Sequence, residues 1–253
     1  MKQNTLKAAM KRGEPQFLIW NQTGSPALAE AAVSAGWRYV LIDTEHGPGG
    51  FETTINTMRA VEAAGGEAIV RVPVNDSTAL KRILDAGALS VMIPMVESGA
   101  DALAAAQSCH YPPRGRRGYA PPIARAARYG VDSDYMTESA NQIMVIVQIE
   151  SVTAVDAIDD IAAVDGIDML FIGPNDLAGS MGKLEQLADP EFRKVMDKAE
   201  EKISKTGKWM GTIPVPGRNM RQTAEAGNLL VAGPSDIVLF MAGAKAAKAE
   251  LNG

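Results

Sequence analysis

The sequence has little cysteine and no long apolar run. Cys109 is the only cysteine among 253 residues, which excludes an internal disulfide and favours a reducing compartment such as the cytoplasm. The opening residues 1–15 are polar and basic and lack the apolar stretch of a signal peptide. No segment approaches the roughly 20 apolar residues that a membrane helix needs. We therefore expect a cytoplasmic protein without a membrane partner.

The sequence also lacks an excess of positive charge. Its 25 lysines and arginines against 30 aspartates and glutamates give a net charge of −5. Apart from a short cluster at Arg114, Arg116 and Arg117, the basic residues are dispersed. A nucleic-acid partner would require a basic face, so we expect none. What is present is 46% hydrophobic and 22% charged residues, a globular composition with enough apolar material for a core.

Short apolar runs alternate with longer amphipathic segments along the whole chain. Parallel strands need crossover helices between them, so this alternation predicts a parallel sheet. The expected strands are Phe17–Trp20, Tyr39–Ile42, Ala68–Val70, Ser90–Ile93, Met144–Ile149, Met169–Ile172, Met210–Ile213 and Leu229–Val231. The expected helices include Ala27–Ala35, Thr53–Ala64, Ala79–Ala86, Ala100–Ser108, Ala154–Ala163 and Phe192–Ser204. Eight such units in about 250 residues predict one (β/α)8 TIM barrel, a single domain over residues 1–253.

One interval interrupts the alternation. Between Cys109 and Gln142 lies a long loop-like stretch with a short helix predicted around Ile123–Tyr129. Loops of this length are uncommon in compact domains and are usually functional or interfacial. The arginine cluster lies in this stretch, where it could grip an acidic substrate, although loop packing or a subunit contact is favoured. We find no linker or repeat that would mark a domain boundary.

Polar side chains collect where the expected strands end, which is where barrels of this kind place their sites. Asp43–Pro48 follows the second strand, and Arg71 ends the third. Gln148 and Glu150 end the fifth strand on one face, because side chains alternate along a strand. Residues 173–176 follow the sixth. A helix cap, an ion pair or a turn histidine would explain each singly, but their coincidence at one barrel end favours a site.

The chemistry of this set is that of enolisation beside a carbonyl. Two carboxylates, Glu150 and Asp176, with few nitrogen or thiolate ligands favour a hard divalent ion such as Mg²⁺ or Mn²⁺. Two protein ligands would leave positions for water and a chelating substrate. Arg71 would stabilise charge developing on an oxygen. His46 would move a proton, directly or through water.

Four motifs together resemble the HpcH/HpaI family. They are Asp-Thr-Glu-His-Gly-Pro (43–48), Tyr-Pro-Pro-Arg-Gly-Arg-Arg-Gly (111–118), Val-Gln-Ile-Glu-Ser (147–151) and Phe-Ile-Gly-Pro-Asn-Asp-Leu-Ala (171–178). The resemblance runs from Leu6 to about Ala247. Within the family it is most specific to the metal-dependent pyruvate aldolases, such as the 4-hydroxy-2-oxoheptanedioate and 2-dehydro-3-deoxyglucarate aldolases. It implies a class II aldolase that reversibly cleaves a 4-hydroxy-2-oxo acid to pyruvate and an aldehyde, with Mg²⁺, Mn²⁺ or Co²⁺ as cofactor.

The resemblance also implies roles for individual residues. His46 would accept the proton, and Asp85 would raise the basicity of the histidine from across a subunit boundary. Arg71 would stabilise the enolate oxygen. The metal ligands would be Glu150 and Asp176.

Pyruvate would be held by Gln148 and by the backbone at Asn175 and Asp176, because free N–H groups at the start of a short helix suit a carboxylate. Two departures from the family pattern leave the aldehyde partner open: Ala120–Pro121 replaces a Gly-Ser pair, and Asn175 replaces the alanine of some relatives. After the last strand, residues 233–236 only approximate the family's Gly-x-Asp pattern.

The family resemblance further implies a homo-hexamer, a trimer of dimers that exchange a C-terminal helix. The alanine-rich tail Val238–Leu251 is compatible with that exchange and equally with a helix packed on its own barrel.

Three other functions compete with this reading. A Schiff-base aldolase needs a lysine in the site, but none follows the strands discussed, and Lys208 precedes the seventh. An oxaloacetate decarboxylase or a CoA-thioester lyase of the same superfamily would share the enolate chemistry. A non-catalytic barrel that binds oxo acids would keep the carboxylates without needing His46, Asp85 and Arg71.

Overall fold

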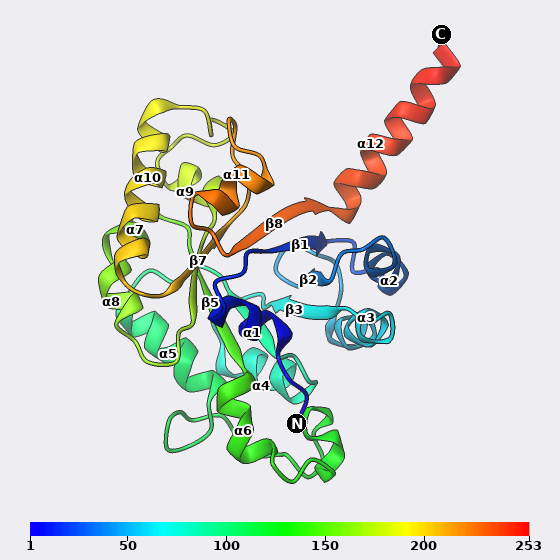
Figure 1. The fold of residues 1–253 in the computed structure, drawn as a ribbon, viewed down its shortest axis with the longest axis vertical. Coiled ribbons are helices and arrows are strands. Elements are labelled where there is room, and N and C mark those ends of the chain that lie inside the picture. Colours follow the sequence, from blue (N-terminus) through cyan, green and yellow to red (C-terminus); the bar gives the residue numbers. More distant parts are fainter. Residues whose placement is uncertain (253) are drawn as a thin grey trace.

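A closed barrel of parallel strands forms the centre of the molecule (Figure 1). The computed structural model describes residues 1–252, and Gly253, the last position of the predicted domain, lies outside them. Each strand pairs with the next, and β8 pairs with β1, so the predicted eight-stranded TIM barrel is confirmed over the described residues. The strands are β1 (Gln16–Asn21), β2 (Tyr39–Asp43), β3 (Glu67–Arg71), β4 (Ser90–Ile93), β5 (Met144–Ile149), β6 (Met169–Ile172), β7 (Trp209–Thr212) and β8 (Leu230–Ser235).

Helices surround the barrel, and most begin at a side chain that satisfies the first free N–H groups. Asp76, Ser98 and Asp189 cap α4, α5 and α10 in this way. The predicted helix Ala154–Ala163 is two short helices, because the backbone at Ala157 leaves the helical conformation. The helices are α1 (Thr5–Lys11), α2 (Pro26–Ser34), α3 (Phe51–Ala63), α4 (Ser77–Asp85), α5 (Gly99–Cys109), η1 (Arg125–Gly130), α6 (Tyr135–Gln142), α7 (Val152–Asp156), α8 (Ile158–Ala162), α9 (Pro174–Ser180), α10 (Pro190–Lys205), α11 (Met220–Glu225), α12 (Asp236–Ala249) and η2 (Glu250–Asn252).

The apolar side chains form two layers because residues alternate between the two faces of each strand. One layer fills the barrel interior and includes Leu18, Leu41, Ile69, Met92 and Phe171. A second, larger layer lies between the strands and the surrounding helices. The interior is therefore packed, and the chemistry of the molecule is confined to the barrel ends.

The amino-terminal end of the barrel is closed by α1. Leu6 and Met10 of this helix belong to the interior cluster. The buried carboxylate of Glu67 accepts hydrogen bonds from the backbone and hydroxyl of Thr5, and Lys7 pairs with Asp168 at 2.9 Å. Helix α1 therefore covers this end of the barrel and closes the interior here.

The loop after α5 contains the 3-10 helix η1 where the sequence predicted a short helix. Arg128 and Tyr129 adopt left-handed backbone conformations, with φ of 49° and 58°, which bend the chain sharply. Within residues 1–252, no helix has the length and apolar character required to span a membrane.

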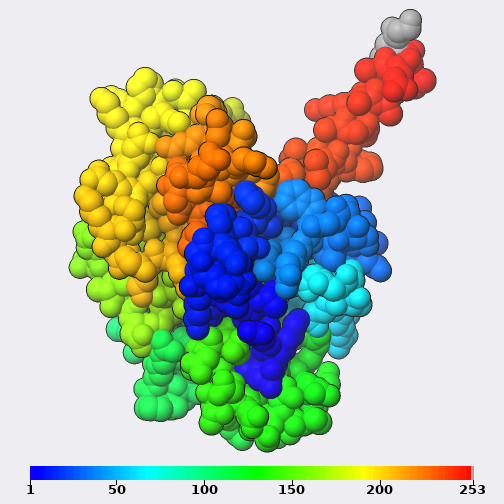
Figure 2. All heavy atoms as spheres, viewed as in Figure 1, coloured from blue at the N-terminus to red at the C-terminus, as the bar shows by residue number. Residues whose placement is uncertain are grey.

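The last helix, α12, projects away from the barrel (Figures 1 and 2). Its apolar side chains Ile237, Val238, Leu239, Phe240 and Met241 are all exposed in the single chain. The alternative in which this tail packs on its own barrel is therefore wrong.

Candidate active site

A cleft of about 270 Å³ lies at the carboxyl ends of the strands. Every predicted site residue except Asp85 lines it, and no lysine does. Lys208 instead donates to the carbonyls of Val164 and Ile167, away from the cleft. The lining residues are Trp20, Gln22, His46, Arg71, Gln148, Glu150, Phe171, Gly173, Pro174, Asn175, Asp176 and Ile213.

Arg71 is held rigidly at the end of β3 by two carboxylates. Its Nε and Nη2 atoms donate to Asp43 at 3.0 and 2.7 Å, and Nη1 lies 2.8 Å from Glu45. The Trp20 ring covers one face of the guanidinium, with its centroid 4.7 Å from Cζ. Burial tends to raise the pKa of Asp43, but the hydrogen bonds and charge of Arg71 outweigh it and hold this pKa below its usual value. Asp43 is therefore ionised, and the guanidinium has one orientation.

The tight turn that follows β2 places His46 beside this ion pair. Asp43 Oδ1 accepts from the backbone N–H groups of Glu45 and His46, at 3.1 and 3.3 Å, a turn that aspartate favours. Gly47 follows because a Cβ there would collide with the Asp43 carbonyl. The imidazole of His46 is 63% exposed, and its Nε2 lies 3.9 Å from Glu45 Oε2. His46 thus faces the cleft mouth, where a substrate proton can reach it.

Glu150, just past β5, is a buried carboxylate with two hydrogen-bond donors. Gln148 Nε2 donates to Oε1 at 2.7 Å, which confirms that the two side chains share a face, and the Met95 backbone N–H donates to Oε2 at 3.0 Å. Met95 adopts a left-handed backbone with φ of 52°, which only a firmly held segment retains. Burial raises the pKa of Glu150 to about 7, and the nearby charges of Asp176 and Glu45 add to this effect.

Asn175 and Asp176 lie in the first turn of α9, across the cleft from Arg71's strand. Gly173 precedes them, and a Cβ at this position would overlap the Glu150 carboxylate. Pro174 fixes the first helical residue. Both Asn175 and Asp176 are exposed, so the cleft combines one buried and one open carboxylate.

Asp85 lies elsewhere, at the end of α4, where its Oδ1 accepts from Arg117 at 2.6 Å. Within the single chain, Asp85 does not line the cleft that His46 lines. Of the arginine cluster, Arg117 is buried, and Arg114 forms a two-hydrogen-bond pair with Asp165 at 3.0 Å. Neither of these two arginines lines the cleft.

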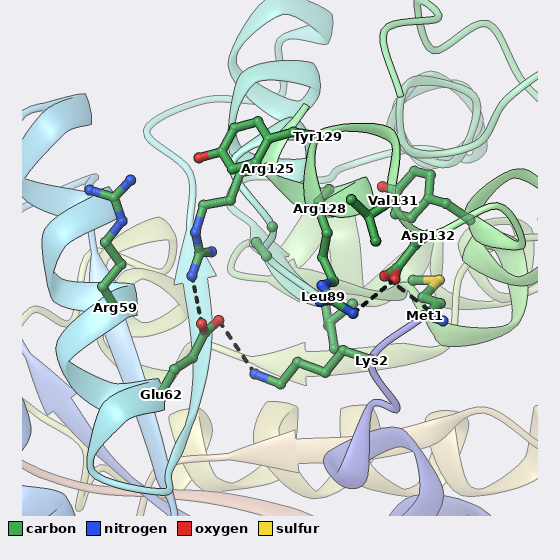
Figure 3. Close-up of a pocket in the computed structure, with 14 residues that line it drawn as sticks. Met1, Lys2, Arg59, Glu62, Leu89, Arg125, Arg128, Tyr129, Val131 and Asp132 are labelled. Atoms are coloured by element: carbon green, nitrogen blue, oxygen red, sulfur yellow. Dashed lines mark hydrogen bonds and ion pairs between the residues drawn. The ribbon is translucent and has the colours of Figure 1, made fainter. Parts of the chain in front are cut away.

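A wider hollow of about 560 Å³ lies between α3 and η1 (Figure 3). Three of its cations have carboxylate partners: Lys2 and Arg125 flank Glu62 at 3.3 and 2.6 Å, and Arg128 lies 3.5 Å from Asp132. None of the predicted catalytic groups lines it. We assign the candidate site to the smaller cleft because the reactive groups converge there.

Sequence reasoning missed two residues of the site, Asp43 and Glu45. They belong to the motif that was singled out for His46. Their place in this motif, Asp43 at the end of β2 and Glu45 in the turn that follows it, was the available signal.

Fold and cleft together define an α/β-barrel enzyme with carboxylates, an arginine and a histidine converging at one end. The chain belongs to the HpcH/HpaI aldolase/citrate lyase family, whose model matches residues 16–242. It is 37% identical over 251 residues to the hydroxypyruvate/pyruvate aldolase of Agrobacterium fabrum, covering 99% of this chain and 94% of that protein. It is 40% identical over 242 residues to the 4-hydroxy-2-oxovalerate aldolase of Novosphingobium aromaticivorans, covering 95% and 92%.

A solved relative has the same fold. The HpcH/HpaI aldolase/citrate lyase family protein of Burkholderia cenocepacia J2315 superposes with a TM-score of 0.93 at 35% identity, over 99% of this chain and 100% of that one. The predicted family, barrel fold and carbon–carbon lyase class are thereby confirmed.

Proposed function

We propose that this chain is a class II pyruvate aldolase that reversibly cleaves a 4-hydroxy-2-oxo acid to pyruvate and an aldehyde. The observation that carries the proposal is the convergence of a fixed guanidinium, Arg71, with the buried carboxylate of Glu150 and the open one of Asp176. Relatives named as pyruvate or hydroxy-oxo-acid aldolases, 37% and 40% identical over nearly the whole chain, support it.

The donor set suits a divalent cation such as Mg²⁺, Mn²⁺ or Co²⁺. No group of three or more histidine, cysteine, aspartate or glutamate side chains gathers within residues 1–252, so Glu150 and Asp176 would be the protein ligands. Burial and the nearby charge of Asp176 make it costly to ionise Glu150, and a cation would remove that cost. Oxygen donors alone select hard ions. When bound, the metal would polarise the carboxylate and 2-oxo oxygens of pyruvate.

The protein groups would divide the remaining work. Arg71, which its two carboxylates prevent from swinging away, would donate to the oxygen that becomes the enolate, at no cost of reorganisation. Gln148 and the backbone N–H groups at Asn175 and Asp176 would hold pyruvate. His46 would take the proton of the 4-hydroxyl in cleavage and return it to the aldehyde oxygen in synthesis.

Cleft size favours small substrates. A volume of about 270 Å³ is below the usual range of drug-sized ligand pockets. Pyruvate and a short aldehyde match it, whereas a CoA thioester would need additional surface. Oxaloacetate has the same chelating unit as pyruvate and would be decarboxylated as a side reaction.

The proposal extends to assembly and location. The exposed apolar side chains of α12 would be covered in a homo-oligomer, a hexamer built as a trimer of dimers that exchange this helix. Asp85, with its carboxylate 24% exposed, would then reach His46 of a neighbouring copy and raise its basicity. We place the enzyme in the cytoplasm.

Activity with and without metal tests the central claim. Exhaustive chelation should abolish condensation of pyruvate with a simple aldehyde, and Mg²⁺, Mn²⁺ or Co²⁺ should restore it. Glu150→Gln and Asp176→Asn should lose metal and activity together, whereas Asp159→Asn, at a carboxylate 74% exposed elsewhere, should lose neither. Full activity in a metal-free preparation, or a borohydride-trapped pyruvate adduct on a lysine, would show that the class II assignment is wrong.

A further inference from the structure

Arg117, in the loop that follows α5, has no exposed side-chain surface. Its guanidinium lies against two tyrosine rings, with Cζ 4.6 Å from the centroid of Tyr111 and 5.8 Å from that of Tyr135. The two rings meet edge to face at 6.3 Å. The backbone N–H of Arg117 donates to the His110 carbonyl at 2.9 Å. Side chain and backbone are therefore both fixed.

The hydrogen bonds of this guanidinium are unevenly distributed. Nη2 donates to Asp85 Oδ1 at 2.6 Å and to the Tyr135 hydroxyl at 3.1 Å. Within residues 1–252, Nε and Nη1 are buried without an acceptor. A buried charge with unmet donors is unfavourable, and an apolar side chain of similar size would pack here at lower cost. Packing therefore does not account for an arginine at this position, whereas its bond to Asp85 does.

Asp85 needs such a partner because of where it lies. It is the last residue of α4, and a helix C-terminus carries partial negative charge that disfavours a carboxylate. The other cations near this end are Arg82, in the last turn of α4, whose Cζ lies 4.0 Å from the centroid of the Phe51 ring, Arg125, which donates to the Ala86 carbonyl at 2.8 Å, and Lys81, which packs against Gly118. Arg117 makes the bond to the Asp85 carboxylate itself. That bond occupies Oδ1 and leaves Oδ2 for a donor from outside the chain.

We propose that Arg117 is a positioning residue that holds the Asp85 carboxylate in place and aims it at the histidine of a second copy of this chain. The inference rests on the proposed function, in which Asp85 supports His46 across a subunit boundary. Arg117 touches no substrate and acts only through Asp85.

A pair of reactions separates this role from a structural one. In Arg117→Met, the maximal rate of aldol cleavage should fall about tenfold or more, as is usual when a residue that orients a functional side chain is removed. The acidic limb of the pH–rate profile should move to lower pH, because Asp85, no longer held toward His46, would support the protonated form of His46 less. Oxaloacetate decarboxylation, which needs no proton from a 4-hydroxyl, should fall less than cleavage. Arg117→Lys should rescue only partly, because an ammonium lacks the planar fork.

A double-mutant cycle tests whether Arg117 works through Asp85. Asp85→Asn alone should reproduce the loss and the shift, and adding Arg117→Met should change little more. Arg114→Met is the matched control, since Arg114 is in the same loop and also pairs with an aspartate, but at the surface. Its pH–rate profile should equal that of the unmodified protein.

The outcomes are distinguishable. No aldolase activity in the unmodified protein would overturn the proposed function itself. Normal cleavage by Asp85→Asn would overturn the role of Asp85 and this inference with it. Losses that multiply in the double variant, or an unshifted limb in Arg117→Met, would overturn only the inference. If Arg117→Met fails to fold or assemble, Arg117→Gln, which keeps a polar side chain but lacks the charge of the guanidinium, replaces it, and an unshifted limb there counts equally against the inference.

Discussion

The two histidines of the chain lie in opposite environments, and this difference predicts how stability depends on pH. His110 is 3% exposed, and within residues 1–252 neither ring nitrogen has a hydrogen-bond partner. Burial lowers the pKa of His110 from 6.5 to about 4, with a further contribution from the charge of Arg114. In the unfolded chain this imidazole titrates near 6.5. Between these values the unfolded state binds more protons, so the free energy of unfolding falls as the pH falls from about 6.5 to about 4.

The size of the effect follows from the two pKa values. Each pKa unit corresponds to about 1.4 kcal/mol, so the stability lost below pH 4 is about 3 kcal/mol, and about 2 kcal/mol is already lost at pH 5. Replacing His110 with leucine removes the titrating group while keeping an apolar side chain of similar size. Urea unfolding of both proteins at pH 7.5 and pH 5, at one protein concentration, measures the change.

The comparison isolates one residue because every other titrating group is common to both proteins. The unmodified protein should lose about 2 kcal/mol more than His110→Leu between the two pH values. Parallel losses in the unmodified protein and in His110→Leu would refute the reasoning, since the buried imidazole would then accept a proton as readily as an exposed one.

Three further predictions concern the reaction. His46→Ala should reduce the rate of cleavage by about 10²–10⁴-fold, while the metal content is kept and the rate of oxaloacetate decarboxylation falls less. Both rates are measured for the variant, and equal losses would mean that the histidine acts on the enolate or the metal site. Arg71→Lys should damage both reactions, because both develop the same charge and an ammonium lacks the fork, and full activity of this variant would contradict the oxyanion role. Competition assays should find strict use of pyruvate or a close 2-oxo acid with tolerance among aldehydes, and the reverse pattern would mean that the acceptor, not the donor, is firmly held.

The barrel and its working end were predictable from the sequence because both depend on local patterns. Alternating apolar and amphipathic segments located the strands to within a few residues; the third, predicted as Ala68–Val70, is Glu67–Arg71. The side chains past each strand then had to share one end. The ion pair between Arg71 and Asp43 was not predictable. It depends on the register that places Asp43 opposite Arg71, and a single sequence does not reveal strand register.

Burial of charge is the other feature that the sequence conceals. Arg114, Arg116 and Arg117 form one basic cluster in the sequence, yet Arg114 forms a partly exposed pair with Asp165 whereas Arg117 is buried between tyrosines. Their difference comes from tertiary contacts with α4 and α6, which lie far away in the sequence. The position of the C-terminal tail was not predictable either, because its composition suits a packed and a projecting helix equally.

Several hydrogen bonds fix the first turn of α12 to the barrel. The Asp236 carboxylate accepts hydrogen bonds from the Asn21 side chain, from the backbone of Gln22 and Thr23, and from Ile237 at the start of its own helix. The helix is therefore mounted on the chain that leaves β1, and Gln22 in that chain lines the cleft. Because α12 is already ordered in the single chain, little conformational entropy is lost when a partner covers it. Gln22 therefore joins the two features, because its backbone N–H binds Asp236 at the base of α12 and the same residue lines the cleft.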